Sequence, residues 1–200
     1  MKPAHLLLGL FGLRLATDGL LWRDLPYQYS YYFEIFLIFL SFFFFKAEFF
    51  QALKIKFNSY FAMATVSFFL LGMATHQLMI TLGLSFPMDM HNLEMLLIAL
   101  LVAPFIEEGI FRFLVWESLL KSNLKISYVI LFTSVLFSFS HFLSYFYLTD
   151  ILQNFILFQT AYTFILSILI GIVRFRTGSL TTSLWVHALY NLGFVVAFFL

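Results

Sequence analysis

Long apolar stretches separated by short polar connections run along the entire chain. Each stretch predicts a helix that crosses a membrane, because about 20 apolar residues match the thickness of the hydrocarbon core of a bilayer. The predicted spans are residues 5–22, 30–45, 58–83, 92–120, 126–147, 151–172 and 179–199. The first is the weakest, because it contains Arg14 and Asp18, and it could instead lie at the membrane interface.

The same pattern indicates the fold class. Backbone groups in hydrocarbon must be satisfied by hydrogen bonds, so membrane-spanning segments are either helices or strands of a closed barrel. The regular alternation of polar and apolar residues that a barrel requires is missing from this sequence. We therefore predict an all-α, polytopic membrane helix bundle of about seven spans, with six to eight allowed by the length. It should form a single membrane domain over residues 1–200.

Composition and charge exclude several classes of protein. The chain has 200 residues, of which 62% are hydrophobic, 22% aromatic and 10% charged, against about 25% charged residues in an average soluble domain. So few charges cannot cover the surface of a soluble protein of this size. A net charge of +1 offers no basic patch, so we expect no nucleic-acid partner. The absence of cysteine excludes disulfides, thiolate zinc sites, iron–sulfur clusters and cysteine nucleophiles.

Basic residues are concentrated in alternate connections between the predicted spans. The connections on one side contain Lys2, Lys46, Lys54, Lys56, Lys121, Lys125, Arg174 and Arg176. The connections on the other side contain only Arg23. Since Lys and Arg accumulate in cytoplasmic loops, this bias places the first group in the cytoplasm and the carboxyl terminus outside. The compact chain, with 30 phenylalanines, is also typical of a prokaryotic protein. We therefore expect a multi-pass protein of the inner or plasma membrane of a prokaryotic cell.

The fourth span carries three ionisable residues in its middle, Glu107, Glu108 and Arg112. Such groups cost at least a few kcal/mol each deep in a bilayer, so each is a functional candidate. Glu108 and Arg112 are four residues apart and can pair on one helix face. Glu107 lies about 100° further round the helix and must find its partner on another helix. Pro104 removes a backbone hydrogen bond and is expected to bend the helix, making room for water.

Two further spans carry polar residues near the same depth. His141 ends the polar segment 137–141, and His187 and Asn191 lie four residues apart on one helix face. At 1.5 Å per residue from the predicted cytoplasmic ends, these residues and Glu107 lie about 14 to 22 Å into the membrane. A carboxylate and an imidazole can share a water and remove its proton, while a second imidazole and an amide can donate to an oxyanion. The pattern indicates a peptidase without a nucleophilic side chain.

The remaining polar residues of the spans have simpler interpretations. His76 and Gln77 are expected to be hydrogen-bonding partners between helices. Glu34, Glu48 and Glu117 lie near enough to the ends of their spans to extend toward water.

Three motifs in the second half of the chain resemble those of the CAAX protease and bacteriocin-processing family of glutamate intramembrane endopeptidases. The first, two Glu followed by three residues and Arg, matches residues 107–112. The second matches residues 137–141 and the third residues 187–191. The order and spacing of all three motifs agree. The resemblance covers about residues 94–195, within a catalytic core expected at about 92–199.

The resemblance implies a role for each motif residue. These roles are activation of the attacking water for Glu107 and His141, the oxyanion hole for His187 and Asn191, and support of the site for Glu108 and Arg112. It implies no metal or other cofactor, and a membrane-associated protein or peptide as substrate. It does not fix the cleavage position, whether the substrate is prenylated, or the oligomeric state. The family often has a glycine after the motif arginine, so Phe113 at that position is expected to alter local packing and substrate entry.

Four other functions stay open at this stage. A non-catalytic membrane protein, such as an immunity protein, could hold a peptide in the same polar pocket, although it has no need for a complete water-activation set. A zinc-dependent membrane peptidase could use Glu107, His141 and His187 as ligands, although the HExxH motif is missing. A rhomboid-like serine peptidase would need its serine close to the histidine, and Ser179 lies near the cytoplasmic end. A transporter is compatible with the composition, but the sequence has one acidic cluster and no obvious inverted repeat.

Overall fold

The computed structural model describes residues 3–18, 28–55, 57–146, 148 and 150–200. Within these residues the regular structure is entirely helical, which confirms the all-α prediction. Three of the basic residues used to predict the orientation, Lys2, Arg23 and Lys56, lie outside the described residues.

Each predicted span corresponds to one helix or to several consecutive helical pieces. The elements in chain order are α1 (Pro3–Asp18), α2 (Gln28–Phe44), α3 (Lys46–Ala52), α4 (Ser59–Thr81), α5 (Leu93–Leu97), η2 (Ile98–Val102), α6 (Ala103–Glu108), η3 (Gly109–Val115), α7 (Trp116–Lys121), α8 (Ile126–Phe142), η4 (Leu143–Phe146), α9 (Asp150–Thr177) and α10 (Leu180–Phe199). The segments η2 and η3 are π-helical, and η4 is a short 3₁₀ turn. The short helix α3 was not predicted, because its residues read as part of the polar connection that follows α2.

Within the described residues, four helical segments are long and apolar enough to cross a membrane, namely residues 59–81, 126–146, 152–177 and 180–199. The apolar helices α1 and α2 are shorter. The central segment from α5 to α7 is divided by its π-helical turns. The count of seven spans therefore stays a prediction.

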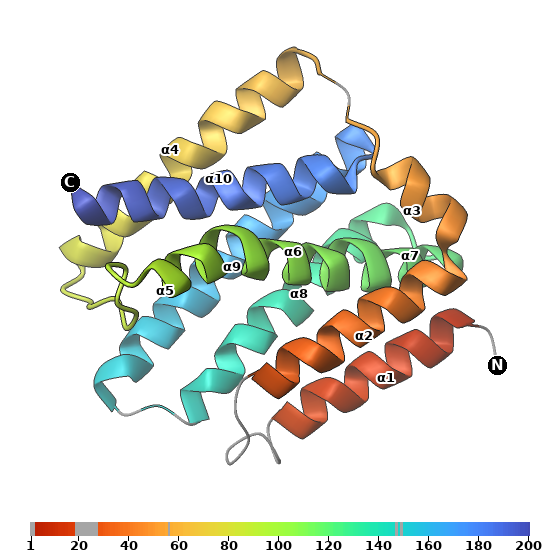
Figure 1. The fold of residues 1–200 in the computed structure, drawn as a ribbon, viewed down its shortest axis with the longest axis horizontal. Coiled ribbons are helices and arrows are strands. Elements are labelled where there is room, and N and C mark those ends of the chain that lie inside the picture. Colours follow the sequence, from red (N-terminus) through yellow and green to blue (C-terminus); the bar gives the residue numbers. More distant parts are fainter. Residues whose placement is uncertain (1–2, 19–27, 56, 147, 149) are drawn as a thin grey trace.

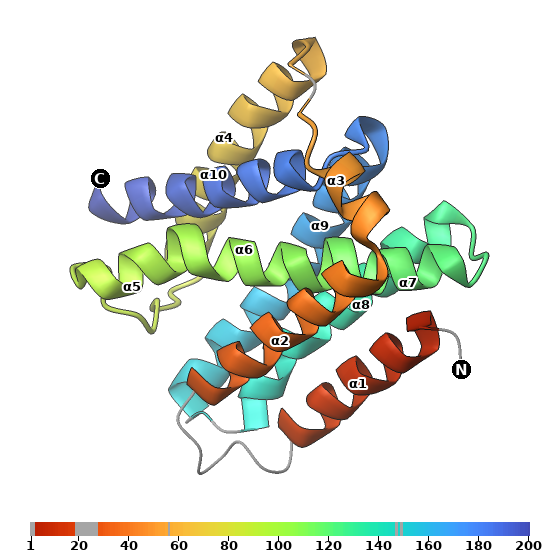
Figure 2. The same ribbon diagram turned by 45° about the vertical axis from the view of Figure 1, so that its right-hand side comes forward.

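A long helical rod made of α5, η2, α6, η3 and α7 runs through the middle of the molecule (Figures 1 and 2). In both views α10 and α4 lie on one side of this rod, α1 and α2 lie on the other, and α8 and α9 cross behind it. The rod that carries the paired glutamates thus packs against both helices that carry the other two motifs, α8 and α10.

The helices α4 and α10 pack closely at two glycines. A Cβ atom at Gly72 would lie 2.0 Å from the carbonyl oxygen of Tyr190, and one at Gly193 would lie 2.0 Å from the carbonyl oxygen of Phe69. The two backbones therefore touch without a side chain between them, as is common where membrane helices cross at small residues. This contact fixes α10, with its third motif, against α4.

Phe113 belongs to a buried apolar cluster that joins α1, α2, η3 and α8. Its ring is fully buried, and its centroid lies 6.3 Å from that of Phe45 and 5.1 Å from that of Phe49. Phe113 does not line the cavity of about 1070 Å³ that lies beside α6, described below. The aromatic residue in place of the family's glycine therefore affects how α2 and α3 pack against η3, and it does not form a wall of the cavity.

The expectation that Glu117 extends toward water is wrong. Its side chain is only 9% exposed, and Nη2 of Arg174 donates to its Oε1 at 3.1 Å. Arg174 lies inside α9 and not in a connection, because α9 continues beyond residue 172, where its span was predicted to end. Two buried charges thus satisfy each other between α7 and α9.

The other polar residues of the spans also find neighbours within the protein. Glu34 forms an ion pair with Arg14, and Glu48 forms one with Lys121. His76 is buried against two phenylalanine rings of α10. Nδ1 of His76 has no hydrogen-bond partner among the described residues, so the hydrogen bond expected between helices is wrong for this residue. Glu34 is 13% exposed and pairs within the protein, so it does not extend toward water as expected.

Candidate active site

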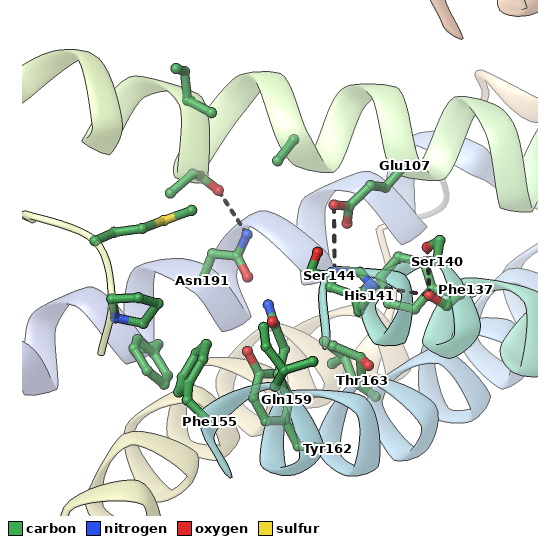
Figure 3. Close-up of a pocket in the computed structure, with 18 of the residues that line it drawn as sticks. Glu107, Phe137, Ser140, His141, Ser144, Phe155, Gln159, Tyr162, Thr163 and Asn191 are labelled. Atoms are coloured by element: carbon green, nitrogen blue, oxygen red, sulfur yellow. Dashed lines mark hydrogen bonds and ion pairs between the residues drawn. The ribbon is translucent and has the colours of Figure 1, made fainter. Parts of the chain in front are cut away.

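A cavity of about 1070 Å³ lies beside α6 in the middle of the protein. Its walls come mainly from α6, α8, α9 and α10, and the connection at residues 86–90 lies at one end. The four residues predicted to act in catalysis all line it: Glu107, His141, His187 and Asn191. In Figure 3, Glu107, His141 and Asn191 face the same space from three different helices. The fold thus brings the three sequence motifs to one place.

Glu107 lies between the two histidines. Its Oε1 is 3.9 Å from Nε2 of His141, and its Oε2 is 3.5 Å from Nε2 of His187. Both distances exceed the usual range for a direct hydrogen bond, about 2.7 to 3.2 Å. A water molecule can bridge Glu107 and His141, because two hydrogen bonds of about 2.8 Å easily span 3.9 Å. With 25% of its side chain exposed, Glu107 is open to the cavity.

The tautomer of His141 follows from its backbone contact. Its Nδ1 lies 2.9 Å from the carbonyl oxygen of Phe137. A carbonyl oxygen can only accept, so Nδ1 carries the proton of the neutral ring. Nε2, which faces Glu107, then has a free lone pair and can accept a hydrogen bond from water.

His187 is held by a carboxylate and not by the backbone. Its Nδ1 lies 2.9 Å from Oε1 of Glu108, which is fully buried. The carboxylate accepts, so Nδ1 carries a proton, and Nε2 can donate only when the ring is an imidazolium ion. In that form the charges of His187 and Arg112 balance those of Glu107 and Glu108, as buried charges require.

Arg112 is fully buried and has few polar neighbours. Its Nε is 3.6 Å from Oε2 of Glu108, too long for a hydrogen bond, and its guanidinium carbon lies 5.2 Å from the centre of the Phe137 ring. Its Nη2 donates to the hydroxyl oxygen of Ser167 at 2.7 Å and to the carbonyl oxygen of the same residue at 2.9 Å. Nε and Nη1 have no hydrogen-bond partner among the described residues. Ser167 therefore supplies both hydrogen bonds of this guanidinium.

Asn191 reaches from α10 to the backbone of the central rod. Its Nδ2 donates to the carbonyl oxygen of Ala99 at 2.7 Å (Figure 3). The π-helical turn leaves this carbonyl free, because the N–H of Ala103 donates to Ile98 and the next residue, Pro104, has no N–H. The disturbance expected at Pro104 thus takes the form of a π-helical turn. The second Nδ2 hydrogen of Asn191 stays free to act in the cavity.

A comparison with models of known protein families assigns the chain to a family. The family model described as type II CAAX prenyl endopeptidase Rce1-like matches residues 89–193, more than half of the sequence and all three motifs. The chain belongs to this family. It is therefore an integral membrane protein and, at the level of the family, a CAAX-type membrane endopeptidase. No curated protein and no solved structure matches the chain.

The helix α9 of this Rce1-like protein contributes polar residues that sequence reasoning missed. Gln159, Tyr162 and Thr163 line the cavity across from Glu107 (Figure 3), and Ser167 holds the buried arginine. Gln159, Thr163 and Ser167 are spaced four residues apart and so share one helix face. This polar stripe is present in the sequence, but the length and apolar character of residues 151–172 predict only a membrane span.

The zinc alternative gains no support from the structure. Among the described residues, no group of three or more histidine or carboxylate side chains is arranged to hold a metal ion.

Proposed function

We propose that this protein is a glutamate-type intramembrane endopeptidase that hydrolyses a peptide bond with an activated water and forms no covalent intermediate. The observation that carries the proposal is the 3.9 Å separation between Oε1 of Glu107 and Nε2 of His141 at the wall of the cavity. This gap fits one water hydrogen-bonded to both groups.

The proton path follows from the two hydrogen-bond acceptors. Glu107 takes a proton from the water while Nε2 of His141 accepts the other hydrogen and orients the nucleophile. The oxygen attacks the scissile carbonyl carbon and forms a tetrahedral intermediate. Glu107 then gives its proton to the leaving amine as the carbon–nitrogen bond breaks. Glu107 returns to its ionised form. The products are an amine and a carboxylic acid whose hydroxyl keeps the second proton of the water.

The negative charge that develops on the oxygen of the scissile carbonyl needs hydrogen-bond donors on the side away from the attacking water. We assign this role to Nε2 of His187 in its imidazolium form and to the free Nδ2 hydrogen of Asn191. Glu108 accepts from Nδ1 of His187 and stabilises that charged form, while Arg112 offsets the charge of Glu108. The supporting roles of Glu108 and Arg112 are thus electrostatic.

The substrate class follows from the cavity and its setting. A volume of about 1070 Å³ is at the upper end of pockets that hold small molecules, roughly 300 to 1,000 Å³. It can accommodate a peptide segment within the membrane domain. The substrate we propose is a membrane-associated protein or peptide, cut by a multi-pass enzyme of a prokaryotic plasma membrane.

A comparison of membrane proteomes tests the proposal. Cells expressing the wild-type protein or Glu107→Gln would be compared for new protein termini. The matched control is Glu94→Gln, which changes an exposed glutamate on the same helical rod. Termini that appear with the wild type and the control but not with Glu107→Gln are expected. If Glu107→Gln produces the same termini as the wild type, the proposal fails.

Chelation separates water activation from zinc chemistry. An active preparation is expected to keep its activity after exhaustive treatment with a strong chelator, because Glu107 and His141 suffice to activate the water. Loss of turnover with the chelator, restored by added zinc, would favour a metallopeptidase.

A further inference from the structure

Ser167 has no direct part in the proposed reaction, yet it touches the residue that balances the charge of the site. We propose that Ser167 is a positioning residue: its hydroxyl fixes Arg112 and, through Arg112 and Glu108, the orientation of His187. The catalytic consequence rests on the proposed function, whereas the positioning itself can be measured without turnover.

The contacts of the guanidinium are the first support. Ser167 is fully buried in α9, and its hydroxyl and carbonyl oxygens accept from Nη2 of Arg112 at 2.7 and 2.9 Å. The other two nitrogens of Arg112 lack hydrogen-bond partners among the described residues. Both bonds are charge-assisted and therefore roughly twice as strong as neutral ones. The bond to the hydroxyl is the shorter of the two, and it is the one that a substitution of the side chain removes.

The behaviour of other hydroxyls in α9 is the second support. Serine and threonine in helices usually donate back to a carbonyl one turn earlier. Thr160 and Thr177 do so, to the carbonyls of Ile156 and Val173 at 2.7 and 2.8 Å. The hydroxyl of Ser167 instead accepts from a buried charge on a different helix.

A second contact from α9 also holds Arg112 in place. Nε of Arg174 donates to the backbone carbonyl of Arg112 at 3.4 Å. Ser167 and Arg174 are seven residues apart, about two helical turns, and so project from the same face of α9. This face therefore holds both the backbone and the side chain of Arg112.

The loss of the Ser167 hydroxyl would affect His187 through Arg112 and then Glu108. The guanidinium lies 3.6 Å from Oε2 of Glu108, whose other oxygen holds Nδ1 of His187 at 2.9 Å. If Arg112 shifts, its attraction for Glu108 weakens, and the carboxylate can turn. A misplacement of about 1 Å can lower turnover by about a hundredfold.

The test compares Ser167→Ala, which removes the hydroxyl, with Ser167→Thr, which keeps it. The matched control is Ser41→Ala, another fully buried serine, whose hydroxyl donates to the carbonyl of Ile38 in its own helix. The first readout is the Nδ1–H signal of His187 in histidine-labelled full-length protein by NMR, assigned from its loss in His187→Gln. The second is kcat and KM on a quenched fluorescent peptide that copies a cleavage site found in the proteome comparison, with the melting temperature of each variant.

We expect Ser167→Ala to shift the His187 signal and lower kcat roughly ten- to a hundredfold, with KM and the melting temperature nearly unchanged. Ser167→Thr and Ser41→Ala should behave like the wild type. An unchanged signal in Ser167→Ala, or a kcat within twofold of the wild type, overturns the positioning role. Full turnover by Glu107→Gln would instead overturn the proposed function, and the NMR comparison would still decide the role of Ser167.

Discussion

Asn191 supplies the hydrogen bond that Pro104 cannot. Both meet at the carbonyl of Ala99, which accepts from the Asn191 amide at 2.7 Å because the π-helical turn and the missing proline N–H leave it free. A proline in a helix thus creates an acceptor that holds a proposed catalytic side chain in the cavity.

Replacing the proline should separate stability from activity. In Pro104→Ala the new N–H can donate to the carbonyl of Ala99 and compete with Asn191. Since proline inside a helix costs about 3 kcal/mol relative to alanine, we expect an equal or higher melting temperature and a lower kcat. Thermal unfolding and turnover measured on the same preparations check this. Unaltered kcat in Pro104→Ala would show that the contact does not position Asn191.

The crossing of α4 and α10 should tolerate no added methyl group. A Cβ at Gly72 or Gly193 would lie 2.0 Å from a backbone oxygen, and overpacking a close-packed contact typically costs about 1 to 3 kcal/mol. We expect Gly72→Ala and Gly193→Ala to lower the melting temperature and activity together. Gly9→Ala and Gly12→Ala are the controls, since an added Cβ there would meet nothing within 4 Å. Equal stability of all four variants would show that the helices do not cross this closely.

The two ion pairs at the ends of α7 should differ in their contribution to stability. The Glu117–Arg174 pair is less than 10% exposed, so Glu117→Gln leaves a buried unpaired charge, a change that costs about 3 to 5 kcal/mol. The Glu48–Lys121 pair is 28% and 52% exposed, and Glu48→Gln should cost less than about 1 kcal/mol. Thermal unfolding of the two variants checks the contrast. Equal losses of melting temperature in the two variants would mean that burial does not determine how much each ion pair contributes to stability.

The exposed pair should also respond to acid. The hydrogen bond from Lys121 lowers the pKa of Glu48 below its ordinary value of 4.5. A carboxyl group with a lowered pKa stabilises the fold fully above its ordinary pKa and loses that effect as the pH falls through the lowered value. The difference in melting temperature between the wild type and Glu48→Gln should therefore shrink below about pH 4.5. A difference that is the same at pH 3 and pH 7 would contradict this contribution.

The proposed orientation can be tested with single cysteines, because the chain has none. The ends of α7 and α9, the start of α8 and all of α3 gather at one end of the molecule, at the right in Figure 1. That end is proposed to be cytoplasmic, so Ser122→Cys should react with a membrane-impermeant thiol reagent only after the membrane is opened, whereas Asp89→Cys should react in intact cells. Ser122 is preferred to its neighbour Asn123, whose φ of 60° would strain a cysteine. The reverse labelling pattern would show that the protein has the opposite orientation in the membrane.

Hydropathy predicted the helices well. A long apolar stretch in a membrane must satisfy its backbone hydrogen bonds internally, and a helix does so. The motifs also identified side chains that the fold brings to one cavity, since Glu107, His141 and His187 project inward from three helices. The π-helical turns could not be predicted, because they depend on contacts between helices. The partners of Glu117 and Arg112 lie 57 and 55 residues away, on a helix whose polar face was overlooked.

The central claim is that Glu107 activates the attacking water, and purified Glu107→Gln tests it most directly. The amide keeps the shape of the side chain but cannot take a proton, and no direct hydrogen bond of Glu107 to another described residue would be lost. We predict that kcat on a substrate identified from the proteome comparison falls by roughly 10²- to 10⁴-fold, with the melting temperature within a few degrees of the wild type. Turnover by Glu107→Gln within a few-fold of the wild-type rate would contradict the account.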